Sequence, residues 1–176
     1  MSYQGGGTVV LSLVQAGNGS SSLGELIRVQ QERALEVIEV RKCMESCIAF
    51  YAAQRALPED LRRMEEILVR MECNLEGRLP SEDLDANLHI VIARATHNIV
   101  WLHLMQSIFD AMKEFQQSIW RAVYVTHEDH QRLFKHHSAI VQAIKDKNPQ
   151  TARDAMAEHL NFAESRSSVY VAQNQM

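Results

Sequence analysis

The sequence predicts an all-α fold, an antiparallel bundle of about six to seven helices with a short strand-like segment at its N-terminal end. Six of the seven glycines fall within the first 24 residues. Beyond that point only Gly77 and three prolines, Pro58, Pro80 and Pro149, interrupt the chain. A β-sandwich or barrel would need turn residues roughly every 8–12 positions, so this distribution favours helices joined by short turns.

The composition suits one compact domain, because 46% of the 176 residues are apolar. The net charge of −4 argues against broad nucleic-acid binding by this chain, since such binding needs a basic surface. No stretch approaches the roughly 18 continuous apolar residues of a membrane span, and the chain does not open with the basic residues of a signal peptide. With three cysteines that form no disulfide framework, we expect a cytoplasmic protein with no membrane partner.

The N-terminal part differs in composition from the rest. Residues 8–14 are predicted to form a short strand behind the glycine run, and a linker rich in glycine and serine follows. A short helix is predicted at residues 23–31. We expect residues 23–172 to form the helical domain and residues 173–176 to fray.

The remaining helices are predicted from apolar spacing and from capping residues. Ser81 can cap the third long helix. Thr126 with Asp129 three residues later starts the fifth, and Asn148 caps the sixth with Pro149 at its first position. The predicted ranges are 33 to the position before Pro58, 59–75, 82–96, 99–124, 126–147 and 149–171. Short connections between them imply antiparallel neighbours.

Four side chains on three of these helices could bind a metal ion. Asp85 and His89 lie one turn apart beside an apolar stripe, although a surface ion pair explains this spacing equally well. His137 and His159 flank the apolar faces of the last two helices. Three imidazoles and one carboxylate suit a divalent ion, zinc first, with nickel or manganese as alternatives. Neutral imidazole is the ligand form, so binding should weaken towards about pH 6.

Two further pairs at i,i+4 spacing lie in the first long helix. Arg41 and Glu45 form a surface ion pair on the simplest interpretation. The alternative is that Arg41 faces inward and grips a carboxylate with its planar guanidinium. Cys43 and Cys47 are interpreted as small buried apolar side chains, because no second thiol pair supports a metal site.

Residues 23–162 resemble the FCD domain, the ligand-binding domain of the FadR branch of the GntR family of bacterial transcription regulators. Each motif is short, but together they form a specific pattern. The motifs are Glu39-Val40-Arg41 followed by Glu45, Tyr51-Ala52-Ala53-Gln54-Arg55-Ala56, Asp85-x-x-x-His89, Ala95-Thr96-His97-Asn98, His137-x-x-Ile140-x-x-Ala143-Ile144 and Ala152-x-x-Ala155-Met156-x-x-His159-Leu160.

The resemblance implies a helical bundle in which Asp85, His89, His137 and His159 hold a divalent metal. It implies a small carboxylate effector of the lactate, pyruvate or glycolate type beside the metal. Arg41 is then the expected partner of the effector, and Asn98 is a second candidate for the pocket. It also implies a homodimer.

The resemblance further implies a winged helix-turn-helix ahead of this domain. The glycine-rich segment at residues 3–10 is similar to the end of its last wing strand. Residues 1–22 are therefore interpreted as a remnant of the wing and its linker, and DNA contact is expected only through the missing domain. We predict a regulator and not an enzyme. The alternatives are a metal-dependent hydrolase, with Glu45 or His136 as general base, and a purely structural dimerisation bundle.

Overall fold

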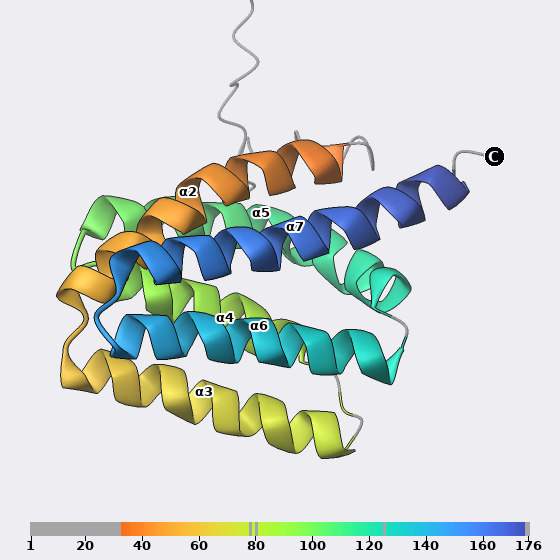
Figure 1. The fold of residues 1–176 in the computed structure, drawn as a ribbon. Coiled ribbons are helices and arrows are strands. Elements are labelled where there is room, and N and C mark those ends of the chain that lie inside the picture. Colours follow the sequence, from red (N-terminus) through yellow and green to blue (C-terminus); the bar gives the residue numbers. More distant parts are fainter. Residues whose placement is uncertain (1–32, 78, 80, 125, 175–176) are drawn as a thin grey trace, which may run out of the picture.

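The computed structural model describes residues 33–77, 79, 81–124 and 126–174. This described part is entirely helical, which confirms the all-α prediction (Figure 1). Its helices are α2 (Arg33–Arg55), α3 (Pro58–Gly77), α4 (Glu82–Arg94), α5 (Ile99–Val123), α6 (His127–Lys145) and α7 (Pro149–Asn174). The strand predicted at 8–14 and the helix predicted at 23–31 lie outside the described residues.

All six described helices contribute side chains to one shared interior. α2 runs along α7, α6 packs against α7, α3 and α2, and α4 contacts α2, α3 and α5 (Figure 1). Burying a large apolar side chain stabilises the fold by about 1.5–3 kcal/mol. The largest fully buried apolar side chains of the described residues are Ile48, Met64, Leu88, Ile92, Met105, Ile140, Ile144, Met156 and Leu160. Polar side chains on the inward faces of α2, α4, α6 and α7 therefore meet away from water.

The helix starts follow local capping chemistry. Thr126 and Asp129 form the predicted capping box, in which each side chain accepts the backbone N–H of the other. Asn148 Oδ1 accepts the Thr151 N–H at 3.2 Å, as a capping residue should. Ser81 precedes α4, but its side chain makes no capping hydrogen bond, so that predicted cap is wrong. Its ψ of 12° departs from the extended conformation that capping requires.

Two helices extend further than the sequence predicts. α3 begins at Pro58, a residue that suits the first helical position, and continues through Gly77, two residues beyond the predicted end at 75. α7 continues to Asn174, beyond the predicted end at residue 171. α4 is shorter than predicted, because residues 95–97 form a turn. Helix ends fray, so the exact last residue is the least regular part of a helix.

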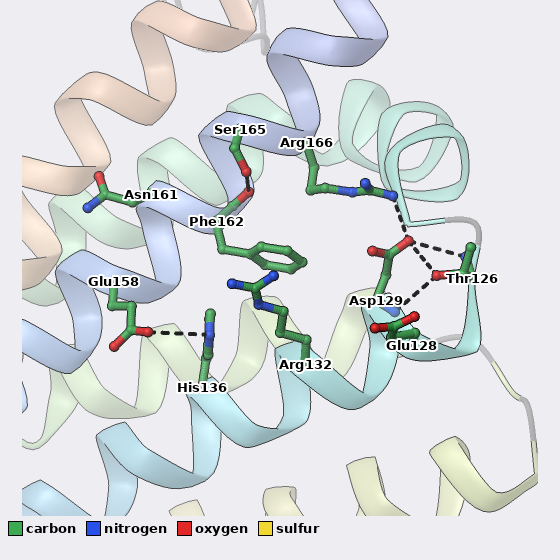
Figure 2. A pocket seen from close by; sticks show the side chains of 10 residues that line it. All are labelled: Thr126, Glu128, Asp129, Arg132, His136, Glu158, Asn161, Phe162, Ser165 and Arg166. Atoms are coloured by element: carbon green, nitrogen blue, oxygen red, sulfur yellow. Dashed lines mark hydrogen bonds and ion pairs between the residues drawn. The ribbon is translucent and has the colours of Figure 1, made fainter.

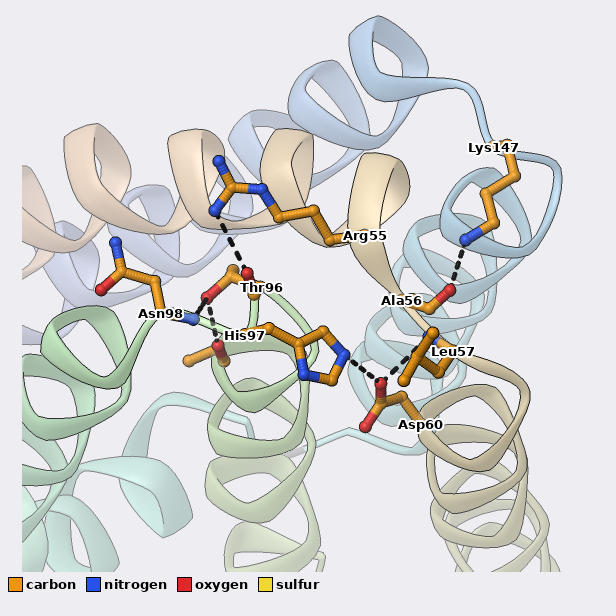
Figure 3. Close-up of polar contacts among 9 residues, drawn as sticks. Arg55, Ala56, Leu57, Asp60, Thr96, His97, Asn98 and Lys147 are labelled. Carbon is orange, nitrogen blue, oxygen red and sulfur yellow. Dashed lines mark hydrogen bonds and ion pairs between the residues drawn. The ribbon is translucent and has the colours of Figure 1, made fainter.

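One end of the bundle is held by contacts between its turns (Figure 3). His97 and Lys147 follow the C-terminal ends of α4 and α6 and have φ values of 52° and 53°, the left-handed conformation that commonly ends a helix. His97 Nε2 lies 2.9 Å from Asp60 Oδ2 on α3. The Lys147 ammonium donates to the carbonyl of Ala56 between α2 and α3. These contacts tie the α4–α5 and α6–α7 turns to the start of α3.

The cysteines do not contribute to the interior as predicted. Cys43 is exposed and Cys47 is half-buried, so their interpretation as buried apolar side chains is wrong. The inward face of α2 instead follows Arg41, Glu45 and Ile48, all buried. Cys43 and Cys47 lie on its flank. Among the described helices, none is long and apolar enough to span a membrane.

Candidate metal and carboxylate site

The four side chains singled out as metal ligands come together inside the bundle. Asp85 and His89 project from α4, His137 from α6 and His159 from α7. One potential ligand atom from each lies within 4.8 Å of the other three. All four residues are buried, with exposed fractions of 1–7%. The surface ion pair considered for Asp85 and His89 is therefore wrong.

Apolar packing places each of these residues. His89 follows Leu88 on α4, and both are buried because α4 is covered by three helices. His137 lies one turn from both Leu133 and Val141 on α6, and His159 precedes Leu160 on α7. The apolar neighbours fix the helix faces, so the polar side chains between them must also point inward.

The three imidazoles are in mutual contact. The ring centroids of His137 and His159 are 4.5 Å apart, and those of His89 and His159 are 5.0 Å apart. His137 Nε2 lies 3.0 Å from Asp85 Oδ1. One carboxylate and three rings therefore converge on a common point.

Three ring nitrogens of this cluster are buried without a hydrogen-bond partner among the described residues: His89 Nε2, His159 Nδ1 and His137 Nε2, the last of which faces Asp85 Oδ1 as an ion-pair neighbour. Leaving such groups unpaired in the interior is unfavourable. A divalent cation bound to nitrogen and oxygen ligands would satisfy these ring nitrogens and is compatible with the carboxylate. The residues present therefore fit a metal ion.

The electrostatics favour the ligand forms of these groups. Burial opposes ionisation of Asp85, but the hydrogen bond and charge of His137, with His89 and His159, hold its pKa below the usual range. Burial lowers the pKa of His159, and the neighbouring His137 and His89 lower it further. Asp85 is thus a carboxylate and His159 a neutral imidazole at neutral pH, the forms that bind metal.

Arg41 and Glu45 lie beside this cluster and are buried, with exposed fractions of 5% and 1%. Arg41 Nε donates to Glu45 Oε1 at 2.5 Å, and the guanidinium carbon lies 4.9 Å from the centroid of Phe109. The i,i+4 pair exists, but in the interior and not on the surface. Arg41 Nη2 is a buried donor without a hydrogen-bond partner within the described part of the chain.

Glu45 is the residue whose position the sequence analysis missed. Its Oε2 contacts His89 Nδ1, which joins α2 to the cluster. Burial opposes ionisation of Glu45, but the charges of Arg41 and His89 outweigh it and lower the pKa of Glu45. The available signal was its register on α2, four residues after Arg41 and three before the buried Ile48.

Asn98 lies apart from these groups, at the start of α5. Its Oδ1 accepts the Val100 N–H at 3.0 Å. Its own backbone N–H donates to Thr96 Oγ1 at 3.2 Å (Figure 3). The side chain therefore caps α5 beyond the C-terminal end of α4. A role for Asn98 in effector binding stays a prediction.

The sequence of this chain matches the family model of the FCD domain over residues 36–162. This range includes every residue of the buried site. The chain belongs to the FCD family. This confirms the resemblance stated from the motifs.

Relatives of this FCD domain are GntR-family transcription regulators and not enzymes. A protein of Escherichia coli K12 named for regulation of the L-lactate dehydrogenase operon is 30% identical over 166 residues. This alignment covers 92% of the present chain and 63% of that protein. The transcriptional regulator LutR of Bacillus subtilis is 30% identical over 160 residues, which cover 88% of this chain and 71% of LutR.

A solved structure supports the fold. The GntR protein of Streptococcus agalactiae aligns with a TM-score of 0.66 and 24% sequence identity. The alignment covers 80% of this chain and 62% of that protein. The present chain therefore spans less than two thirds of the length of two of these relatives.

A surface cleft of about 660 Å³ in this FCD domain lies on α6 and α7, outside the metal cluster (Figure 2). It is lined by side chains that include Arg132, His136, Glu158, Phe162 and Arg166, and by none of the four candidate ligands. His136 is half-buried, and its ring centroid lies 5.4 Å from that of Phe162. His136 and His137 are adjacent in sequence, yet only His137 belongs to the cluster.

We expect the metal-free FCD domain to lose stability as the pH falls below about 6.5, the ordinary pKa of an unfolded histidine. Because the pKa of His159 is lowered in the folded state, the unfolded chain binds more protons below this pH and unfolding is favoured. The lowered pKa of Asp85 acts in the same direction at more acidic pH. Urea unfolding in chelator, from about pH 8 to about pH 5, measures this dependence. His159→Gln should weaken this dependence of stability on pH. The same dependence in the variant would show that His159 does not cause it.

Proposed function

We propose that this domain binds a divalent metal ion through Asp85, His89, His137 and His159, and binds a small carboxylate beside it. The bound metal ion and carboxylate would control DNA binding by a winged helix-turn-helix domain, which is attached to this helical domain in the whole regulator. The observation that carries this proposal is the burial of unpaired metal-binding ring nitrogens next to an unpaired arginine donor.

The donor set favours zinc, with nickel or manganese as alternatives. Three imidazoles and one carboxylate, without a thiolate, are borderline-to-hard ligands. Four protein ligands leave room for one or two further oxygens if the ion takes five or six ligands. A carboxylate oxygen of an effector can occupy such a position.

Arg41 supports the carboxylate part of the proposal. Its Nε is bound to Glu45, while Nη2 remains a buried donor without a partner in the described part of the structure. Charge-assisted hydrogen bonds from guanidinium to carboxylate are among the stronger ones in proteins. Because one relative is named for the L-lactate dehydrogenase operon, lactate, pyruvate and glycolate are the effectors to test first.

Regulation would follow from differential binding. An effector shifts a regulator between two arrangements only as far as it binds one of them more tightly. We propose that the regulator is a cytoplasmic homodimer, because two copies can place paired DNA-binding domains on a two-fold operator. Sedimentation of this chain with and without metal tests the dimer.

The experiment that tests the site is titration calorimetry on metal-loaded and chelator-treated protein. L-lactate, pyruvate and glycolate are the ligands, and lactamide, which lacks the charge of lactate, is the control. We expect at least one of the three carboxylates to bind the metal-loaded protein. Binding should be at least tenfold weaker after chelation, and at least tenfold weaker for lactamide than for lactate, a loss of about 1.4 kcal/mol in binding free energy. Absence of bound metal would contradict the metal site, and metal-loaded protein that binds none of the carboxylates would contradict the effector.

The hydrolase alternative has no comparable support. Its two candidate bases were Glu45 and His136. Glu45 is bound by Arg41 and His89, and His136 lines the cleft on α6 and α7. The relatives are transcription regulators and not enzymes.

A further inference from the structure

A buried carboxylate from α2 contacts one of the candidate metal ligands from α4. The side chains of Glu45 and His89 have exposed fractions of 1% and 0%. Glu45 Oε2 contacts His89 Nδ1, although the residues are 44 positions apart in the sequence. This contact lies on the side of the imidazole that faces α2, away from the free Nε2 atom.

The contact determines which ring nitrogen carries the proton. A neutral imidazole has one N–H donor and one lone pair, and an ionised carboxylate only accepts hydrogen bonds. The proton between Glu45 and His89 therefore lies on Nδ1. The lone pair then lies on Nε2, which is the buried nitrogen without a hydrogen-bond partner among the described residues.

We propose that Glu45 is a positioning residue for the metal centre, which holds His89 as its Nδ1–H tautomer and turns the Nε2 lone pair towards the other three ligands. This inference rests on the proposed metal site. Metal-binding histidines commonly donate their second N–H to a carboxylate or carbonyl, which fixes the ring and strengthens it as a ligand. Glu45 supplies that carboxylate from a different helix.

Arg41 holds Glu45 in place for this task. Its Nε donates to Oε1 at 2.5 Å while His89 occupies Oε2, so both carboxylate oxygens are bound. A carboxylate fixed at both oxygens cannot rotate away from the imidazole. The orientation of His89 therefore depends on a chain of contacts from Arg41 through Glu45.

The first test uses the unaltered chain. Long-range ¹H–¹⁵N spectra of metal-free protein labelled at histidine report which ring nitrogen is protonated, and His89→Gln identifies the signals of His89. We expect the proton on Nδ1. A proton on Nε2 would overturn the assignment. This measurement does not depend on the folding of any Glu45 variant.

The second test compares two variants of buried carboxylates. Glu45→Gln removes the charge beside His89, and Asp60→Asn removes the charge in the matched pair with His97, outside the cluster. We expect Zn²⁺ affinity, measured by chelator competition, to fall about 10–100-fold in Glu45→Gln and to stay within about twofold of wild type in Asp60→Asn. The absorption bands of bound Co²⁺ should also change in Glu45→Gln alone.

The two proposals fail in different ways. Wild-type protein that binds no metal would overturn the metal site and the role of Glu45 with it. Wild-type protein that binds Zn²⁺ while Glu45→Gln binds it equally tightly, with the same Co²⁺ spectrum, would overturn the role of Glu45 alone. Glu45→Asp keeps the charge and should recover part of the lost affinity.

Discussion

His159→Ala is expected to remove the divalent metal from the domain. The substitution deletes one of the four candidate ligands and leaves Asp85, His89 and His137 without the imidazole that α7 contributes. Metal analysis should find about one equivalent in wild-type protein, as a single four-ligand site requires, and much less in the variant. His136→Ala is the matched control, because His136 neighbours the cluster but is not part of it.

Thermal unfolding gives a second measure of the same change. Metal at a free concentration about a thousand times its Kd adds roughly 4 kcal/mol of stability. In a domain of this size that raises Tm by about 8–16 °C. We expect this rise in wild type and in His136→Ala, and little or none in His159→Ala. Equal metal content and an equal rise in Tm for His159→Ala would exclude His159 as a ligand.

Arg41→Ala is expected to destabilise the domain strongly and to abolish carboxylate binding. The variant leaves Glu45 as a buried charge that has lost its arginine partner, a change that typically costs about 3–5 kcal/mol. Urea unfolding measures the free energy of unfolding, and calorimetry measures carboxylate affinity. A variant as stable as wild type would show that the buried Arg41–Glu45 ion pair does not stabilise the fold.

Arg41→Lys separates the two effects. Lysine keeps a positive charge near Glu45 but lacks the planar fork of donors. We expect bound metal to be retained, while carboxylate affinity falls roughly tenfold to a hundredfold, as for loss of one hydrogen bond to a charged group. Unchanged carboxylate affinity in this variant would remove Arg41 from the effector site.

Most of the fold was predictable because its signals are local. The scarcity of glycine and proline after residue 24 and the caps at Thr126 and Asn148 act over a few residues. The helices α3 and α7 end at Gly77 and Asn174, two and three residues beyond their predicted ends, because helix ends fray and local breakers alone do not fix the last residue. Ser81 shows the same limit, since a suitable residue in the capping position did not adopt the capping conformation.

The sequence was enough to predict which four side chains meet in the candidate site, but not which residues lie beside them. The spacing of Asp85 and His89, with the resemblance to a known domain, was enough to select four candidate ligands, and the structure brings these four side chains together. The spacing of Arg41 and Glu45 was not informative, because an i,i+4 pair looks the same in a sequence on a surface and in a core. The structure places this pair in the interior.

The sequence by itself determined the helical class, most helix boundaries and the set of four candidate ligands, because breakers, caps and residue spacing are properties of short segments. Only the tertiary structure decided that Glu45 faces His89 and that the Arg41–Glu45 pair lies in the interior and not on the surface. The physical reason is that these outcomes depend on which faces of α2, α4, α6 and α7 are buried together. That choice is made by the packing of the whole apolar core, in which residues far apart in the sequence exclude water from a shared interior.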